Sequence, residues 1–143
     1  MKKTDLAYMA GLFDGEGTVS IVKPKDKCHR LHVSIGSTDE WVCQSFKMMF
    51  GGTITKLKLV QGTRGYNRQA WKWSSSARIA HQMLLVLFPY LHLKRPQAEI
   101  AIKFQLSINS LNRRRMNNDQ TVVREAEAIL VKSMNKAKRI QTI

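Results

Sequence analysis

The chain has 143 residues, which is enough to close one hydrophobic core and too few for two independent ones. Its 24 Lys and Arg against 10 Asp and Glu give a formal net charge of +14, so a polyanion is the expected partner. The longest apolar run, 83–91, is too short to span a bilayer and contains Pro89, which favours nucleic acid over a membrane.

The cysteines give no sign of a zinc-binding module, and the amino terminus gives no sign of an export signal. Cys28 and Cys43 show no CxxC spacing, so reduced thiols are expected. A metal held by these two cysteines with His29 and His32 is an alternative, but such irregular spacing favours ordinary packed or exposed side chains. No apolar stretch ending in a cleavage site follows the amino terminus, so no export signal is expected.

The first part of the chain predicts a helix followed by a hairpin. The helix covers about 6–14, is capped by Thr4 or Asp5, and ends at Gly15 and Gly17. Alternation of polar and apolar residues predicts strands at 18–23 and 30–35. The apolar face of this hairpin comprises Val19, Ile21, Leu31, Val33 and Ile35, and the polar face Thr18, Ser20, Arg30, His32 and Ser34.

A second helix and a second hairpin follow in the same order. The helix covers about 38–50, is capped by Ser37 or Thr38, and is stopped by Gly51-Gly52. The strands are expected at 53–60 and 69–74, joined by a loop at 62–65. Lys56 and Lys58 alternate with Leu57 and Leu59 on the first of these strands, and Trp71 and Trp73 are expected in the core.

Helical signals dominate the rest of the chain. Ser74, Ser75 and Ser76 cap a helix to about Leu87, and Pro96 suits the first turn of the next. That helix has Ala101, Phe104, Ile108 and Leu111 on one stripe, and after a basic break at 113–119 a last helix, 122–139, has Ala126, Ile129, Ser133, Ala137 and Ile140 on one face.

This order of elements predicts an α+β fold in a single domain, 1–143. The core covers about 5–112, and a carboxyl-terminal helical extension covers about 119–140. One antiparallel sheet is expected, and such a sheet can bury one face and leave the other to a ligand.

The first helix has one stripe almost without side chain, formed by Ala7, Ala10, Gly11 and Asp14. A bare stripe lets two helix backbones approach closely, so it predicts the interface of a dimer. Tight packing within one subunit is the alternative, and only the complete motif described below favours the dimer. The opposite stripe of Leu6, Met9 and Phe13 is expected to fill the core of the subunit.

Asp14 and Glu16 stand at the carboxyl end of this helix, where the helix dipole disfavours a carboxylate by ~0.3–1 kcal/mol. Two acids at this end of a helix predict a bound cation. Mg²⁺ fits, because it often takes only one or two carboxylates together with phosphate and water. Taken alone, Asp-Gly-Glu-Gly is more often a turn than a metal site.

The segment Met9-Ala10-Gly11-Leu12-Phe13-Asp14-Gly15-Glu16-Gly17 closely resembles the LAGLIDADG motif of homing endonucleases, with Met for Leu at the first position and Glu for Asp at the eighth. The segment from Pro89 to Ala98 is similar to the family's later P-x-L-x-x-K-x-x-Q-A pattern. The resemblance covers about 6–104. It implies an αββαββα core with an antiparallel DNA-binding saddle and, because one motif is present, a homodimer.

The resemblance also implies roles for individual residues. Glu16 is the expected catalytic carboxylate and metal ligand, Gly15 lends its main-chain carbonyl to the metal, and Lys94 orders or activates solvent at the cut phosphate. The family often has Gln or Asn at the end of the second strand, but 35–39 contains no amide, so Ser37 is the expected substitute. Mg²⁺ is the expected cofactor, with Mn²⁺ as a replacement and Ca²⁺ supporting binding without cleavage.

The implied function is that of an intron-homing, site-specific endonuclease, which makes a staggered double-strand break at a long pseudo-palindromic DNA site. The expected location is inside the cell with genomic DNA, in a bacterial, phage or organellar compartment. For Lys56 and Lys58, protection of a sheet edge is the alternative to DNA binding. The expected DNA contacts are Ser20, Arg30, His32, Lys56, Lys58, Arg64, Arg68 and Lys72.

Two other functions stay open at this point. A DNA-binding regulator of the same fold, or an RNA-splicing maturase, would bind nucleic acid without cutting DNA. An RNA-binding sheet would be expected to expose stacking aromatic side chains. The presence of both Glu16 and Lys94 favours the nuclease.

Overall fold

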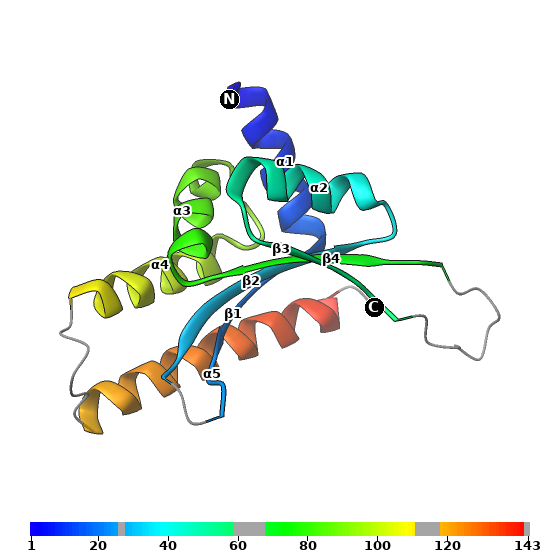
Figure 1. Cartoon of the computed structure of the whole chain (residues 1–143). Coiled ribbons are helices and arrows are strands. Elements are labelled where there is room, and N and C mark those ends of the chain that lie inside the picture. Colours follow the sequence, from blue (N-terminus) through cyan, green and yellow to red (C-terminus); the bar gives the residue numbers. More distant parts are fainter. Residues whose placement is uncertain (26–27, 59–67, 111–117, 142–143) are drawn as a thin grey trace.

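A computed structural model describes residues 1–25, 28–58, 68–110 and 118–141 (Figure 1). The helix that carries the motif runs directly into the sheet, and three further α-helices follow the second pair of strands in the described residues. The elements are α1 (Lys3–Glu16), β1 (Gly17–Val22), β2 (Arg30–Ser37), α2 (Glu40–Phe50), β3 (Thr53–Lys56), β4 (Trp71–Ser76), α3 (Ala77–Leu87), the 3-10 helix η1 (Phe88–Tyr90), α4 (Arg95–Ser110) and α5 (Asn118–Gln141). This order confirms the predicted αββαββα core with carboxyl-terminal helices.

The four strands form one antiparallel sheet in the order β1-β2-β4-β3. The second strand of each hairpin lies at the centre, where Ser34 pairs with Ser74 and His32 with Ser76. Helices α1, α2 and α3 lie on one side of this sheet, and the amino-terminal end of α1 projects away from it (Figure 1). The carboxyl end of α1 therefore meets the sheet where β1 begins.

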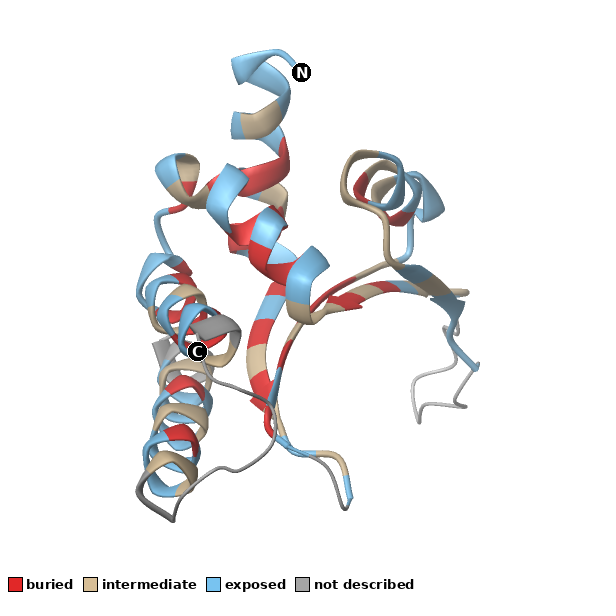
Figure 2. Ribbon diagram, turned by 60° about the vertical axis from the view of Figure 1, so that its left-hand side comes forward, coloured by how far each residue is buried: buried red, intermediate tan, exposed pale blue. Residues whose placement is uncertain are grey.

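The hydrophobic core lies between the helices and one face of the sheet. Buried and more exposed residues alternate along the strands, as Figure 2 shows. This confirms the predicted apolar face of the first hairpin, because all five of its members are at most 7% exposed. Ser34 departs from the prediction: it belongs to the polar face yet is 7% exposed, because Thr18 and Ser74 flank it on the two neighbouring strands.

The turn between α2 and β3 depends on its two glycines. Gly51 and Gly52 have φ angles of +79° and +93°, a region that side chains with a Cβ avoid. A Cβ on Gly52 would stand 2.7 Å from the carbonyl oxygen of Ser74. Trp73 is fully buried beneath this turn and donates from Nε1 to the carbonyl oxygen of Gly51 at 2.8 Å. The predicted stop of the second helix is thus confirmed.

The structure corrects three predicted helix caps. α1 begins near Lys3, where the main-chain N–H of Lys2 donates to Asp5 at 3.3 Å. α2 is capped by Asp39, which accepts from the N–H of Trp41 at 3.0 Å, rather than by its neighbours in the sequence. Ser76 occupies the N-cap position of α3, as predicted, but it also ends β4 and makes no side-chain capping hydrogen bond. At α2 a nearer acceptor replaces the expected cap, and at α3 the serines belong to strand β4.

The predicted buried face is confirmed in part for α4 and is wrong for α5. In α4, Ala101 and Phe104 are fully buried as expected, whereas Leu111 lies outside the described residues. The predicted apolar face of α5 is wrong: Ala126, Ile129, Ser133 and Ala137 are exposed, and nothing is described of the Ile140 side chain.

The buried face of α5 is a different one. Arg124 and Val131 are buried, and Asn135 donates from Nδ2 to the main-chain oxygen of Val19 at 2.9 Å. α5 lies along the edge strand β1, and this bond satisfies an acceptor of that strand. α5 thus docks through a different face from the predicted one, with Val131 in the hydrophobic core and a polar contact from Asn135. None of the helices in the described ranges is long and apolar enough to cross a membrane.

Candidate functional site

The carboxyl end of α1 presents Gly15 and Glu16 on the surface. Gly17 follows at once as the first residue of β1, and its N–H donates to the carbonyl oxygen of Phe13. A side chain at Gly17 would collide with the buried ring of Phe13, so only glycine fits this junction. The junction places the Glu16 carboxylate where the helix meets the sheet.

Lys94 reaches the same end of α1 from a distant part of the sequence. Its Nζ donates to the main-chain oxygen of Asp14 at 2.9 Å, and the residue is only 5% exposed. In return, the Asp14 carboxylate accepts from the main-chain N–H groups of His92 at 2.8 Å and Lys94 at 3.0 Å. Lys94 is thereby held at the helix terminus where Glu16, the other predicted site residue, also lies.

Ser37 and Glu16 line one hollow, with a volume of about 420 Å³. The hydroxyl of Ser37 accepts from the N–H of Asp39 at 3.0 Å, so it also shapes the turn into α2. The structure therefore places Ser37 in the same hollow as Glu16, but the Ser37 hydroxyl oxygen also accepts the hydrogen bond that shapes this turn. Among the described residues, the hollow is lined by Glu16, Gly36, Ser37, Thr38, Leu57 and Ala70.

These residues fit a cation that is only partly coordinated by the protein. Within the described ranges, no group of three or more His, Cys, Asp or Glu could hold a metal ion. Glu16 offers one carboxylate, and Gly15 stands in the last turn of α1, where carbonyl groups lack helical partners. Mg²⁺ suits such a sparse set, because it retains several waters and shares its coordination with phosphate oxygens.

The alternative site around Cys28 and Cys43 finds no support in the structure. Cys28 is exposed, whereas Cys43 is buried and contacts the main-chain oxygen of Ile35 at 3.9 Å. The four side chains considered for that site form no cluster among the described residues.

The bare stripe of α1 differs from the predicted set in two members. Ala10 is fully buried and Asp14 is 7% exposed, so neither side chain is available to a second subunit. The helix turns these positions inward because Asp14 binds the segment at 92–94. Ala7, Gly11 and Gly15 are exposed, and a Cβ on either glycine would meet nothing within 4 Å. The exposed small-residue face therefore repeats every four residues.

The polar face of the sheet gathers four of the predicted DNA contacts. Ser20 pairs with His32, and Arg30 and Lys72 follow on the same face by strand alternation. Burial, together with the nearby charges of Lys72 and Arg30, lowers the pKa of His32 below 6.5. This face is thus cationic without a charge on His32.

The other predicted contacts are placed differently. Lys56 is two residues from Ile54, which pairs with the buried Trp73, so Lys56 lies on the opposite face of β3 and its assignment to the polar face is wrong. Lys58 and Arg68 are exposed beyond the ends of the strands, and Arg64 lies outside the described residues.

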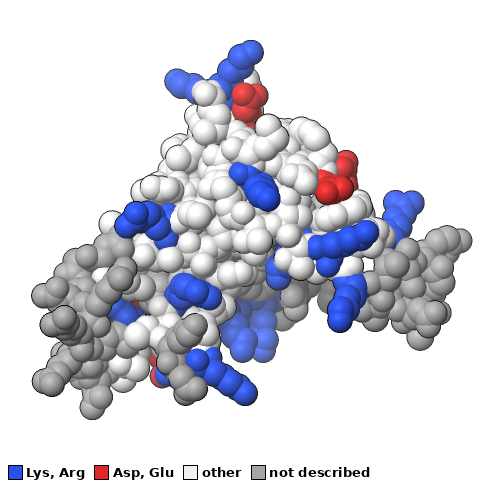
Figure 3. Space-filling model, in the orientation of Figure 1, with Lys and Arg blue, Asp and Glu red and all other residues white. Residues whose placement is uncertain are grey.

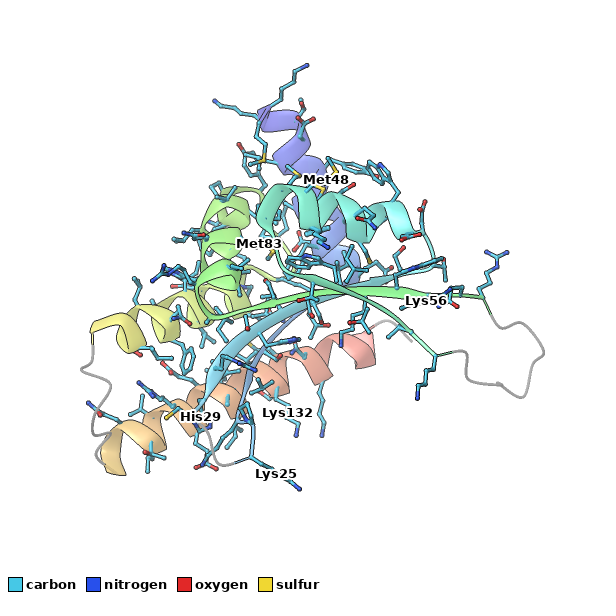
Figure 4. The ribbon with its side chains drawn as sticks, viewed as in Figure 1. Lys25, His29, Met48, Lys56, Met83 and Lys132 are labelled. Carbon is cyan, nitrogen blue, oxygen red and sulfur yellow. The ribbon has the colours of Figure 1, made fainter. Side chains whose placement is uncertain are left out.

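Basic residues also spread beyond the sheet. Lys and Arg outnumber Asp and Glu on the face shown in Figure 3. Figure 4 places Lys25 near the tip of the first hairpin and Lys132 on α5, on the side of the molecule away from α1. The predicted DNA contacts included no residue of α5, although Lys132 is exposed on this helix.

The two tryptophans of β4 bear on the RNA-binding alternative. Trp73 is fully buried, and Trp71 is partly buried against the core. The core position predicted for Trp73 is confirmed. Neither residue belongs to the polar face of the sheet, because that face carries Lys72 and Ser74 between and beside them.

A single motif helix that runs into a four-stranded antiparallel saddle defines the class: the chain has the fold of the LAGLIDADG homing endonucleases. No protein-family model and no curated protein sequence matches the chain. The comparison that places it is with solved structures.

Homing endonuclease I-CvuI, in complex with the I-CreI target and Mg²⁺ with the DNA not cleaved, is 19% identical with a TM-score of 0.70, covering 92% of this chain and 82% of that one. The archaeal intron-encoded homing endonuclease I-Vdi141I, complexed with DNA, is 15% identical with a TM-score of 0.65, covering 94% and 86%. The LAGLIDADG meganuclease I-AabMI, bound to uncleaved DNA, is 20% identical with a TM-score of 0.53, covering 73% of this chain and 36% of that one.

Proposed function

We propose that this chain is a divalent-metal-dependent endonuclease that acts as a homodimer. It binds a long pseudo-palindromic DNA site through the polar face of the sheet and makes a staggered double-strand break. The observation that carries the proposal is the meeting of Glu16, Gly15 and Lys94 at the carboxyl end of α1. The solved structures support it further, since I-CvuI and I-Vdi141I were captured with DNA.

Each residue has a distinct task in this mechanism. Glu16 and the carbonyl of Gly15 would hold Mg²⁺, which when bound supplies a Lewis acid and lowers the pKa of a coordinated water. Lys94 places a positive charge beside this helix end, where it stabilises negative charge on the scissile phosphate and orders the attacking water. The Ser37 hydroxyl lines the same hollow as Glu16 and offers solvent there one more hydrogen-bonding group.

Dimerisation would occur along Ala7, Gly11 and Gly15. Gly11→Leu is expected to weaken dimerisation roughly 10- to 100-fold, because a large side chain overpacks a close helix contact. The same substitution leaves the single subunit folded, since a Cβ on Gly11 meets nothing within 4 Å. Sedimentation at graded concentrations measures the change. A variant that dimerises as tightly as the original chain contradicts this interface.

DNA binding at the polar face would change the titration of His32. Its pKa is held below 6.5 in the free protein, so the unfolded chain binds the proton more readily. His32 thus lowers the free energy of unfolding as the pH falls below 6.5. Phosphates close to His32 favour its charged form and raise its pKa, so duplex binding is expected to strengthen as the pH falls.

Titration of the His32 ring by NMR, with and without saturating duplex, checks this expectation. His32→Gln serves as the control, because duplex binding by this variant should lose the corresponding part of its pH dependence. An unchanged pKa of His32 on duplex binding would remove this residue from the interface.

The activity itself is tested by selecting cleaved molecules from a randomised duplex library in the presence of Mg²⁺. The proposal predicts recovery of one long, nearly symmetric site with staggered ends. Tight binding of duplex DNA without cleavage of any library member would favour a non-cleaving regulator. Preference for structured RNA over duplex DNA in a competition assay would favour a splicing maturase.

A further inference from the structure

We propose that Asp14 is a positioning residue that fixes Lys94 at the carboxyl end of α1, so that the reaction depends on a side chain that touches neither DNA nor metal. The inference rests on the proposed nuclease function for the role of Lys94. It makes the sixth position of the motif a separate element of the site, distinct from the ligand at Glu16.

The burial of Asp14 shows that its carboxylate serves the interior of the subunit. It is 7% exposed, and a buried carboxylate is strongly unfavourable unless hydrogen bonds compensate for the lost water. One oxygen, Oδ2, accepts from the N–H of His92, and the other, Oδ1, accepts from the N–H of Lys94. The carboxylate thus joins two alternate peptide groups of the segment that precedes α4.

The side chain of Lys94 is tied to the same residue. Its Nζ donates to the main-chain oxygen of Asp14, so Asp14 holds both ends of the lysine, the peptide N–H through its carboxylate and the ammonium through its carbonyl. Leu91 and Gln97, on either side of the segment, are also buried. A long flexible side chain is thereby fixed in one place before any substrate binds.

Asp14→Asn tests whether Asp14 fixes the 92–94 segment and Lys94, with little change in side-chain volume. The amide oxygen can accept from one N–H, but the amide nitrogen then faces the other N–H donor. Asp5→Asn is the matched control, because it makes the same chemical change at the opposite end of the same helix, where Asp5 is exposed. Asp14→Glu keeps the charge and serves as the second variant if the asparagine variant does not fold.

The first measurement is single-turnover cleavage of the selected duplex at saturating protein, combined with the Kd for that duplex. Asp14→Asn is expected to cut roughly 10- to 100-fold more slowly with Kd changed by less than about 2-fold, whereas Asp5→Asn cuts at the original rate. Because Asp14 acts through Lys94, the double variant Asp14→Asn with Lys94→Met should cut no more slowly than Lys94→Met alone. Independent, multiplying losses would overturn the inference.

The second measurement does not depend on cleavage. Amide hydrogen exchange at His92 and Lys94 is expected to be at least about 10-fold faster in Asp14→Asn, or in Asp14→Glu, than in the original chain and in Asp5→Asn. Unchanged exchange at both amides would contradict the proposal that Asp14 fixes this segment. If the original chain does not cut any duplex, the proposed function fails, and the exchange experiment still decides whether Asp14 fixes this segment.

Discussion

Replacement of Glu16 by Gln is expected to lower the rate of DNA cleavage by about 10³-fold while leaving duplex binding within a few-fold. The substitution keeps the shape of the side chain but removes the charge that balances a divalent cation. Glu16 is exposed at the last residue of α1 and fills no place in the core, so the fold is expected to persist. Single-turnover cleavage and a binding isotherm on the same duplex separate the two effects.

The matched control for this experiment is Glu40→Gln. Glu40 is also exposed and lies near a helix terminus, but in the first turn of α2, outside the hollow that Glu16 lines. The control should cut at the original rate, which shows that loss of one surface charge is not the cause. Cleavage by Glu16→Gln at the original rate would remove this residue from the chemistry.

Replacement of Lys94 by Met has the second-largest expected effect, a loss of about 10²- to 10³-fold in the cleavage rate. Methionine keeps an unbranched apolar stem of similar length but lacks the ammonium group that contacts the main-chain oxygen of Asp14. Duplex affinity should change little, because Lys94 is 5% exposed and contributes little to the outer basic surface.

Lys103→Met is the control for this second substitution. Lys103 forms an exposed pair with Glu99 on α4 at 3.0 Å, and such pairs contribute only ~0–1 kcal/mol. The control should therefore be active and nearly as stable as the original chain. If Lys94→Met cuts as fast as Lys103→Met, the ammonium group has no part in the reaction.

Most of the sheet and the junction at the motif followed from sequence patterns with short periods. Alternation of Val19 and Ile21 on β1 and of Leu31, Val33 and Ile35 on β2 specified the buried face, because strand periodicity leaves only two faces to choose from. Glycines at 51 and 52 specified a chain reversal that only they could make. At these positions the structure agrees with the prediction, whereas the face of the short strand β3, which carries Lys56, was predicted wrongly.

The inward face of α1 could not be derived in the same way. Alanine at position 10 suits both a subunit core and a dimer contact, and Asp14 on the same stripe suggested an exposed surface. The partners of Asp14 are main-chain N–H groups 78 and 80 positions away, and no side-chain pattern records them. The sequence therefore indicated candidate site residues at this helix end but not what Asp14 binds.

The orientation of α5 failed for a related reason. The helix has an apolar stripe through Ile129 and another through Val131, and periodicity alone does not rank them. The structure buries Val131 and leaves Ile129 62% exposed, and on the buried side Asn135 donates to an acceptor of the edge strand β1. The buried side of the helix thus combines an apolar contact of Val131 with a polar contact of Asn135.

Cleavage by a mixed dimer tests the central proposal most directly. Differently tagged copies of the original chain and of Glu16→Gln are combined, the mixed species is purified, and each strand of the selected duplex is followed separately. Two motif helices that meet about a twofold axis, each with its own glutamate, predict that the mixed dimer nicks one strand and leaves the other intact. Cleavage of both strands by the mixed dimer, or a chain that cuts fully as a monomer, would contradict the account.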